Sequence, residues 1–250
     1  MPRFQIHIGI DYSGAATPET PLPGIRIATA RGGRCELESP GENWSRRGTA
    51  EWLLEILKKP EPAIVGIDHG FSFPFAWFET HEVPKNWDDF LESFCSEFPT
   101  DRPGSKVDDF LKNPEVRKGN ARWRRAAEIR CKAKSVFHFG VPGSVAKSTH
   151  AGIPWLRFLR KQLGTKIHFW PFDGFRIPDG KHVIAEVYPS LWRKGEAPPG
   201  ITLDEFDTLT IARTLSDSDS TGEMELMFQP DLAESEKRLA ELEGWILGVR

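Results

Sequence analysis

The chain has 250 residues, which is long enough for one substantial domain that carries an inserted subdomain. Its hydrophobic fraction of 39% and its charged fraction of 28% are typical of an ordinary soluble globular protein. A formal net charge of -3 gives no general signature of nucleic-acid binding, so any electrostatic attraction to a polyanion must be local.

Cysteine usage and the lack of long apolar runs restrict the cellular setting. Cys35, Cys95 and Cys131 are widely spaced and form no CxxC pair, which argues against a disulfide scaffold or a thiolate zinc site. The first residues show no signal-peptide pattern, and no apolar run approaches the roughly 18 residues that span a bilayer. We therefore expect a cytoplasmic protein with no membrane partner, while the oligomeric state stays open.

The first seventy residues predict four strands and one helix. Apolar runs or alternating patterns bounded by turn residues predict strands over 4–11, 24–30, 34–39 and 63–70. The Arg-Gly-Gly triplet at 31–33 fits a hairpin turn between the second and third strands. Apolar residues at helical spacing predict a helix over 49–59, with Thr49 as its N-terminal cap.

The rest of the chain predicts a helical insertion followed by a return to strands. Residues 75–160 form a mainly helical insertion, with helix candidates at 87–98, 107–113, 120–133 and 152–164. Strands follow at 165–172 and 182–191, then helices at 201–216 and 234–249 around a polar loop at 216–222. No linker divides the chain, so we expect a single domain over 1–250. Three hairpin-joined strands at its start favour a mixed sheet over a doubly wound one.

Acidic side chains stand at the ends of three of these apolar strands. Asp11 and Asp68 each close a Gly-Ile-Asp triplet, and if their strands are parallel neighbours both carboxylates emerge at one edge of the sheet. Glu186 has a comparable place, and a buried charge there is costly unless it is paired or bound to a cation. Asp204 and Asp207 lie three residues apart, hence on one face of a helix.

Convergence of these carboxylates would create a site for hard divalent cations. Oxygen ligands favour Mg²⁺ or Mn²⁺, and two such ions about 3.5–4 Å apart support phosphodiester hydrolysis. Each acid alone has an ordinary explanation, because an Asp at a strand end is more often a turn former or a helix cap. A D-x-x-D helix is likewise often a solvated face. The order and placement of all five acids together favour the metal site.

The order of the acids resembles that of the ribonuclease H-like superfamily. The helix at 203–212 resembles the D-x-x-D-A-x-x-x-A helix of Holliday-junction resolvases. In closer detail the chain is similar to a predicted RNase H-like nuclease family catalogued as domain of unknown function 429. The matching segments span nearly the whole chain and are 8–15, 65–74, 134–156, 169–174, 185–192 and 243–249.

The resemblance implies a mixed five-stranded sheet with its first three strands antiparallel, helices on both faces and a metal-dependent nuclease activity. It implies Asp11, Asp68 and Asp207 as metal ligands on the first strand, the fourth strand and the late helix. Glu186 is the conspicuous further acid of the family, and Asp204 completes the expected metal set. The catalytic residues would then be Asp11, Asp68, Glu186 and Asp207, with two Mg²⁺ or Mn²⁺ ions.

Two residues depart from the family pattern. Thr208 stands where a small Ala follows the helix Asp, and His69 follows Asp68 where an apolar residue is commoner. Neither change removes a ligand, and His69 becomes a candidate for an extra general acid.

A basic stretch within the insertion is a candidate surface for a phosphate backbone. From Arg102 to Lys134 there are eleven Lys or Arg against four acids, a local excess of seven positive charges. An equally weighted alternative is a solvated helix whose charges pair with acids of the same protein. The loop at 143–149 lacks the Gly that a P-loop needs before its Lys. The candidate substrate-binding residues are Ser13, His69, Arg122, Arg124, Arg125, Lys134 and Lys147.

Two other functions stay open beside a nuclease acting on DNA or RNA. An ATP-dependent phosphotransferase of the actin and sugar-kinase type shares the core fold, but the Asp11–Gly14 turn resembles its phosphate loop only loosely. A chain of 250 residues is also short for that two-lobed architecture. A non-catalytic nucleic-acid-binding module is disfavoured, because unpaired carboxylates would destabilise an unused site.

Overall fold

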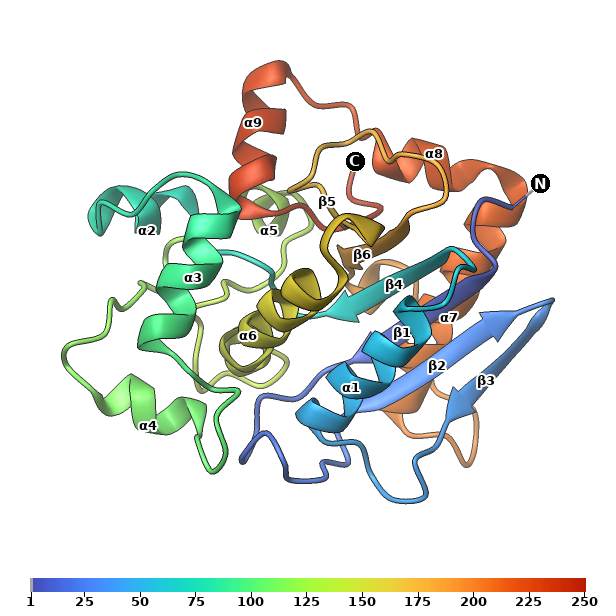
Figure 1. Cartoon of the computed structure of the whole chain (residues 1–250), viewed down its shortest axis with the longest axis horizontal. Coiled ribbons are helices and arrows are strands. Elements are labelled where there is room, and N and C mark those ends of the chain that lie inside the picture. The colour runs from blue at the N-terminus through green and yellow to red at the C-terminus, as the bar shows by residue number, and fades with distance from the viewer. Residues whose placement is uncertain (1) are drawn as a thin grey trace.

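Six strands form one mixed sheet in the computed structural model, which describes residues 2–250 (Figure 1). Their order across the sheet is β3-β2-β1-β4-β6-β5. The first three strands are antiparallel, as predicted, and β1, β4, β6 and β5 run parallel to one another. The strands are β1 (Ile6–Asp11), β2 (Arg26–Arg31), β3 (Arg34–Glu38), β4 (Ala63–Asp68), β5 (Ile167–Trp170) and β6 (His182–Glu186).

The count of five strands that the resemblance implies is wrong, whereas all six segments predicted as strands contain one. The additional strand is β5, whose four residues are all buried and which pairs only with β6 at the outer edge of the sheet. A short, fully buried segment of this kind is stable as an edge strand because its faces are covered.

One face of the sheet is covered by α1 (Arg46–Leu57) and α6 (Ala146–Leu163), and α3 (Trp87–Glu97) packs on α6 (Figure 1). Alternate residues of β1, Ile6, Ile8 and Ile10, belong to the same hydrophobic cluster as Leu53 of α1 and Leu156 of α6. Since α6 is part of this core, the helical segment between β4 and β5 does not have a core of its own.

The opposite face is covered by α7 (Leu203–Thr221), which lies across β1, β2 and β4. Ile211 and Leu215 of α7 cluster there with Val183 and Ala185 of β6. Helices therefore cover both faces, as predicted. The remaining elements are α2 (Phe75–Thr80), α4 (Val107–Lys112), α5 (Ala126–Arg130), α8 (Glu223–Phe228), α9 (Glu234–Glu243) and the short 3-10 helices η1 (Gly164–Lys166) and η2 (Pro189–Leu191).

Two helices begin earlier than the sequence indicates. Ser45, not Thr49, caps α1, because its hydroxyl accepts a hydrogen bond from the backbone N–H of Gly48 at 3.0 Å. The Thr49 hydroxyl donates instead to the carbonyl of Ser45. Helix α6 begins at Ala146 rather than at residue 152, so Pro154 lies inside the helix.

Three other segments also differ from the expected boundaries. The polar stretch 216–222 is not a loop, because α7 continues through it, and Asp219 accepts hydrogen bonds from the backbone N–H groups of Arg3 and Phe4 at 2.8 and 2.9 Å. In the basic segment 120–133 only α5 is helical. After α9 the chain extends, and Ile246 forms a parallel bridge with Glu186 of β6.

Two glycines under α7 allow this helix to lie close to the sheet. Gly9 and Gly66 are register partners on β1 and β4. A Cβ added to Gly9 would stand 2.4 Å from the carbonyl oxygen of Thr208, and one added to Gly66 would stand 2.9 Å from Ile211. Because alternate strand residues face the same side, these glycines share the α7 face with the acids two residues further on. The repeated Gly-Ile-Asp triplet thus combines a docking surface with an acid.

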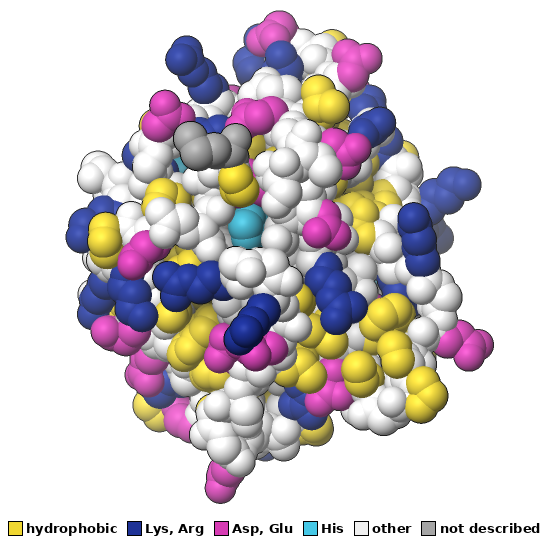
Figure 2. Space-filling model, turned by 90° about the vertical axis from the view of Figure 1, so that its right-hand side faces the viewer, with side chains coloured by type: hydrophobic (Ala, Val, Ile, Leu, Met, Phe, Trp, Pro, Cys, Tyr) yellow, Lys and Arg dark blue, Asp and Glu magenta, His cyan; other side chains and the backbone are white. Residues whose placement is uncertain are grey.

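The face on the right of Figure 1 carries Lys and Arg side chains interspersed with Asp and Glu, as Figure 2 shows. Side chains of both charges are therefore mixed on this face. Within residues 2–250, no helix is long and apolar enough to cross a membrane.

We predict that Gly9→Ala lowers the free energy of unfolding by about 1–3 kcal/mol, because α7 must move away from the sheet. Urea unfolding followed by circular dichroism measures this effect. Gly24→Ala is the matched control, since an added Cβ there meets its nearest neighbour at an ordinary 3.5 Å. Equal stability of the two variants would contradict the close packing at Gly9.

Candidate functional site

Asp11 and Asp68 lie side by side at the carboxyl edge of the sheet. Each is the last residue of its strand, and the two are register partners in the parallel pair of β1 and β4. The expectation that their strands are parallel neighbours is confirmed. Both residues are half-buried at this edge.

Two further acids approach from the first turns of α7. The pKa of Asp11 is raised to about 7, first by burial and then by the negative charges of Asp204 and Asp207. The pKa of Asp68 is raised well above its usual value by burial and then by Asp11, Asp207 and Glu186. Such mutual effects require the carboxylates to be close together. We call Asp11, Asp68, Asp204 and Asp207 the carboxylate cluster.

Arg193 is a residue of this site that sequence reasoning missed. Its Nη1 donates to both carboxylate oxygens of Asp207, at 2.7 and 2.8 Å. Burial raises the pKa of Asp207, and the hydrogen bond from Arg193 opposes that rise. No local pattern marks Arg193, because it reaches the cluster only through the turn that follows β6.

Glu186 does not join the carboxylate cluster, which corrects its expected place among the metal ligands. It is the register partner of Ile67, so it shares the α6 face of the sheet, whereas Asp68 shares the α7 face with Gly66. The Glu186 carboxylate accepts hydrogen bonds from Arg125 at 2.5 and 2.6 Å and from the backbone N–H of Phe71 at 3.3 Å. It is buried and paired with Arg125, although it lines a small cavity together with Asp68 and its negative charge raises the pKa of Asp68.

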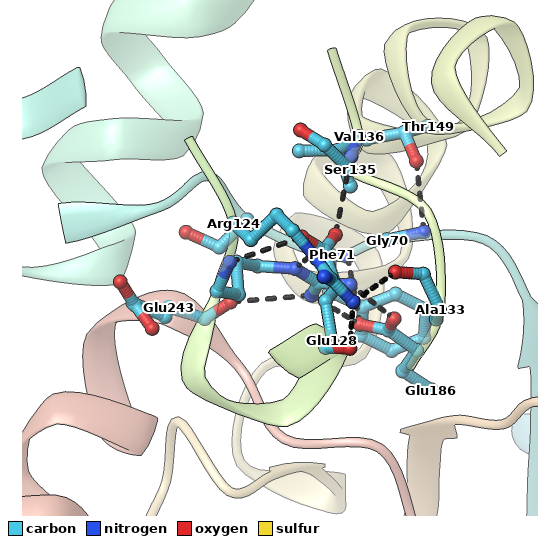
Figure 3. Close-up of polar contacts among 12 residues, drawn as sticks. Gly70, Phe71, Arg124, Glu128, Ala133, Ser135, Val136, Thr149, Glu186 and Glu243 are labelled. Atoms are coloured by element: carbon cyan, nitrogen blue, oxygen red, sulfur yellow. Dashed lines mark hydrogen bonds and ion pairs between the residues drawn. The ribbon is translucent and has the colours of Figure 1, made fainter. Parts of the chain in front are cut away.

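Arg125 is the centre of a buried ionic network. Figure 3 labels Glu128, Glu186 and Glu243, which contact it. Arg125 is fully buried and contacts Glu128 at 3.0 Å and the carbonyl of Glu243 at 3.3 Å. Glu128 in turn accepts a hydrogen bond from the backbone N–H of Val136 at 3.1 Å. The network joins β6, α5, the segment after β4 and the end of α9, so Arg125 is structural and cannot contact a substrate here.

His69 is the second substrate candidate that the structure removes. Its ring is buried between Tyr12 and Phe71, with ring centroids 4.7 and 5.1 Å away. Nδ1 lies 2.8 Å from the carbonyl oxygen of Gly70, which fixes it as the protonated ring nitrogen. Burial lowers the pKa of His69 to about 4, so the ring is neutral at neutral pH and is no general acid there.

Other residues of the expected basic surface are held by contacts within the protein. The guanidinium of Arg124 donates to the carbonyls of Glu128 and Ala133, both at 2.6 Å, and Lys147 pairs with Asp108 at 2.8 Å. These contacts support the alternative in which the basic side chains of the segment bind groups of the same protein rather than a nucleic acid. Arg122 is exposed, and Ser13 is half-buried on the loop that follows β1.

A small cavity of about 20 Å³ lies between the ends of β4 and β6. Asp68, Glu186, Tyr188 and Lys134 are among the residues that line it. Such a volume holds about one water-sized species. Lys134 is exposed, lines this cavity and donates to the carbonyl of Pro142.

The carboxylate cluster has the oxygen ligands that a hard divalent cation prefers, but its side chains are not arranged around a common metal position. Oxygen ligands of this kind suit Mg²⁺ or Mn²⁺. Burial first, and then the neighbouring carboxylates, raise the pKa values of Asp11 and Asp68. Among residues 2–250, no three His, Cys, Asp or Glu side chains are set to hold a metal ion as they stand.

Comparison of the chain with protein-family models, with curated proteins and with solved structures gives no match. The resemblance to an RNase H-like nuclease family therefore stays a prediction from the sequence. A functional conclusion has to rest on the geometry and charge of the carboxylate cluster.

We predict that Glu186→Gln destabilises the fold by about 3–5 kcal/mol, because it leaves the buried Arg125 guanidinium without its main partner. Urea unfolding of this variant and of the exposed control Glu196→Gln provides the comparison. If Glu186 is structural, metal affinity of the folded variant stays at the wild-type value. A large loss of metal affinity without loss of stability would restore Glu186 to the ligand set.

The raised pKa of Asp11 predicts a specific dependence of stability on pH. In the unfolded chain this carboxyl loses its proton near pH 4, but in the folded protein it keeps the proton up to about pH 7. The folded state binds more protons in that window, so this group's contribution to stability falls as the pH rises from about 4 to 7.

Asp11→Asn should therefore raise the melting temperature at pH 8 and change it little at pH 4. Thermal melts of the metal-free protein across this pH range test the expectation, with Asp231→Asn as the exposed control. A melting temperature at pH 8 that does not rise in Asp11→Asn would contradict the unrelieved repulsion in the cluster.

Proposed function

We propose that the protein is a metal-dependent nuclease of ribonuclease H-like fold. The observation that carries the proposal is that Asp11 and Asp68 end register-paired parallel strands and share one face with Asp204 and Asp207. An assembly of carboxylates, of which Arg193 pairs with one, offers the oxygen ligands that hard cations prefer. Mg²⁺ or Mn²⁺ bound there, as two ions, would supply the Lewis acidity for phosphodiester hydrolysis.

The topology supports the fold part of the proposal. Three antiparallel strands lead through α1 into a parallel strand, and both central strands end in an acid. The acid-bearing α7 then returns to cover these two strands. This order is the one that the resemblance implies, with β5 as an added edge strand.

The residues of the cluster take different roles in this proposal. Asp11 and Asp68 are the firmest ligands, because strand ends hold them with little freedom. Asp207 is the helix ligand, and Asp204, one turn earlier on α7, lies beside Gly24. Lys134 and Arg122 remain exposed and able to contact the phosphate backbone of a nucleic acid.

The proposal predicts strand cleavage that depends on a divalent cation. Purified protein would be incubated with labelled single-stranded, duplex and branched DNA and RNA in Mg²⁺, Mn²⁺ or EDTA. We expect cleavage with Mg²⁺ or Mn²⁺, none with EDTA, and loss of cleavage in Asp68→Asn, which keeps the side-chain shape but removes a ligand charge. Asp231→Asn, on the surface, keeps full activity.

Each alternative has its own outcome in the same experiment. Cleavage that persists in Asp68→Asn would remove the cluster from the active site. Metal-stimulated ATP hydrolysis without strand cleavage would favour the phosphotransferase. Oligonucleotide binding with neither reaction would favour a non-catalytic binding module.

A further inference from the structure

A pocket of about 360 Å³ lies at the amino edge of the sheet, where β5 and β6 begin. It is bounded by the segment that follows α1, by η1 and by the turn before β6. Because β1, β4, β5 and β6 run parallel, Asp11 and Asp68 stand at the opposite edge, where β1 and β4 end. The volume is within the range of small-molecule sites, about 300–1,000 Å³.

Four lysines from three separate segments line this pocket, which we call the lysine pocket. Lys58 and Lys59 follow α1, Lys166 is the last residue of η1, and Lys181 directly precedes β6. A cation beside the C-terminus of a helix is favoured by the helix dipole. That effect accounts for the lysines after α1 and in η1 but not for Lys181. It also does not require lysines of separate segments to line one pocket.

The acids around the lysine pocket are fewer than its lysines. Asp179 lines the pocket, but its side chain is fully exposed and lies 3.6 Å from the guanidinium of Arg3. Glu55 pairs with Lys58 at 2.7 Å. Glu61 does not line the pocket, although its charge acts on the neighbouring His182.

The other three lysines keep their charge free for a ligand. No acid among residues 2–250 forms an ion pair with Lys59, Lys166 or Lys181. The lining of the pocket has four lysines against one acid, a local excess of three positive charges. Like charges held around one pocket repel one another, so a bound anion would stabilise their arrangement.

His182 gives the lysine pocket a fixed wall. Its side chain is buried, and Nδ1 accepts a hydrogen bond from the backbone N–H of Ala63 at 3.2 Å. Nε2 therefore carries the proton and donates to the carbonyl of Lys59 at 3.1 Å. Burial lowers the pKa of His182, and the charge of Lys166 lowers it further, so the ring is neutral at neutral pH. The ring thus joins β6 to the start of β4 and to the segment after α1, and the positive charge comes from the lysines.

The lining residues favour phosphate groups as the ligand chemistry. A lysine ammonium binds phosphate as a point charge with three donors, and the exposed Thr165 adds a hydroxyl. Among the described residues that line the pocket, His182 is the only one with an aromatic ring, and that ring is held by backbone contacts. The bases of a nucleic-acid strand would therefore find no stacking surface. A small phosphorylated molecule needs none.

We propose that the lysine pocket binds a small molecule that carries one or more phosphate groups, with Lys59, Lys166 and Lys181 as the cations that hold it. A phosphate monoester carries about -1.5 to -2 charges at neutral pH, which the free lysines can match. The pocket lies at the opposite edge of the sheet from the carboxylate cluster, so the inference does not depend on the proposed nuclease function.

The test titrates inorganic pyrophosphate into the full chain by calorimetry, in metal-free buffer of low ionic strength. We expect binding by the wild type, and a dissociation constant that rises about tenfold or more in the double variant Lys166→Gln/Lys181→Gln, which loses two charged donors. The control Lys85→Gln/Lys237→Gln removes the same charge outside the pocket, from lysines paired with Glu79 and Glu234, and should bind as the wild type does. Thermal melts establish that each variant is folded.

Hydrogen exchange followed by mass spectrometry locates the bound pyrophosphate without any substitution. We expect slower amide exchange at 164–166 and 179–182 and unchanged exchange at 11–14, at the other edge of the sheet. Slower exchange confined to 11–14 would place the anion elsewhere and overturn the inference.

The remaining outcomes are equally decisive. If the wild type does not bind pyrophosphate, or if both double variants lose affinity equally, the lysine pocket is no specific phosphate site. A single-stranded oligonucleotide that binds only when Lys166 and Lys181 are present, with no binding of pyrophosphate, would assign the pocket to nucleic acid and overturn the small ligand. None of these results alters the expectation of metal-dependent strand cleavage, which is tested separately.

Discussion

The close approach of α7 to β1 and β4 is the constraint on which the rest of the site depends. Side chains larger than hydrogen at Gly9 and Gly66 would collide with the backbone of Thr208 or with Ile211. Because the gap is this narrow, the first turns of α7 reach the ends of the two strands. The acids of the helix and those of the strands then share one small volume. The carboxylate cluster is therefore a consequence of backbone packing as much as of its acids.

The sheet also separates two groups of acids that are close in space. Asp11 and Asp68 face α7, whereas Glu186 faces α6, since its register partner is Ile67 rather than Asp68. An offset of one residue reverses the side of a strand on which a residue lies. On the α7 side the carboxylates raise one another's pKa values. On the other, Arg125 neutralises Glu186 and fixes the surrounding segments.

Each of the two groups of acids has its own arginine, Arg125 beside Glu186 and Arg193 beside Asp207. Arg125 is committed to a buried network, and removing either partner of its ion pair with Glu186 leaves an uncompensated charge. Arg193 holds Asp207 at the edge of the sheet, where water can replace it. The Arg125–Glu186 pair is buried, whereas the side chains of Arg193 and Asp207 are 27% and 13% exposed.

Local patterns in the sequence determined the strands, most helices and the acids at the ends of β1 and β4, because alternation and helical spacing are properties of neighbouring residues. The antiparallel start of the sheet follows from the short hairpin connection between β2 and β3. Only the tertiary structure decided the register, and with it the side on which Glu186 lies. It alone paired Arg125 with a residue 61 positions away and brought Arg193 to Asp207. Such contacts depend on how distant elements pack, which no local pattern encodes.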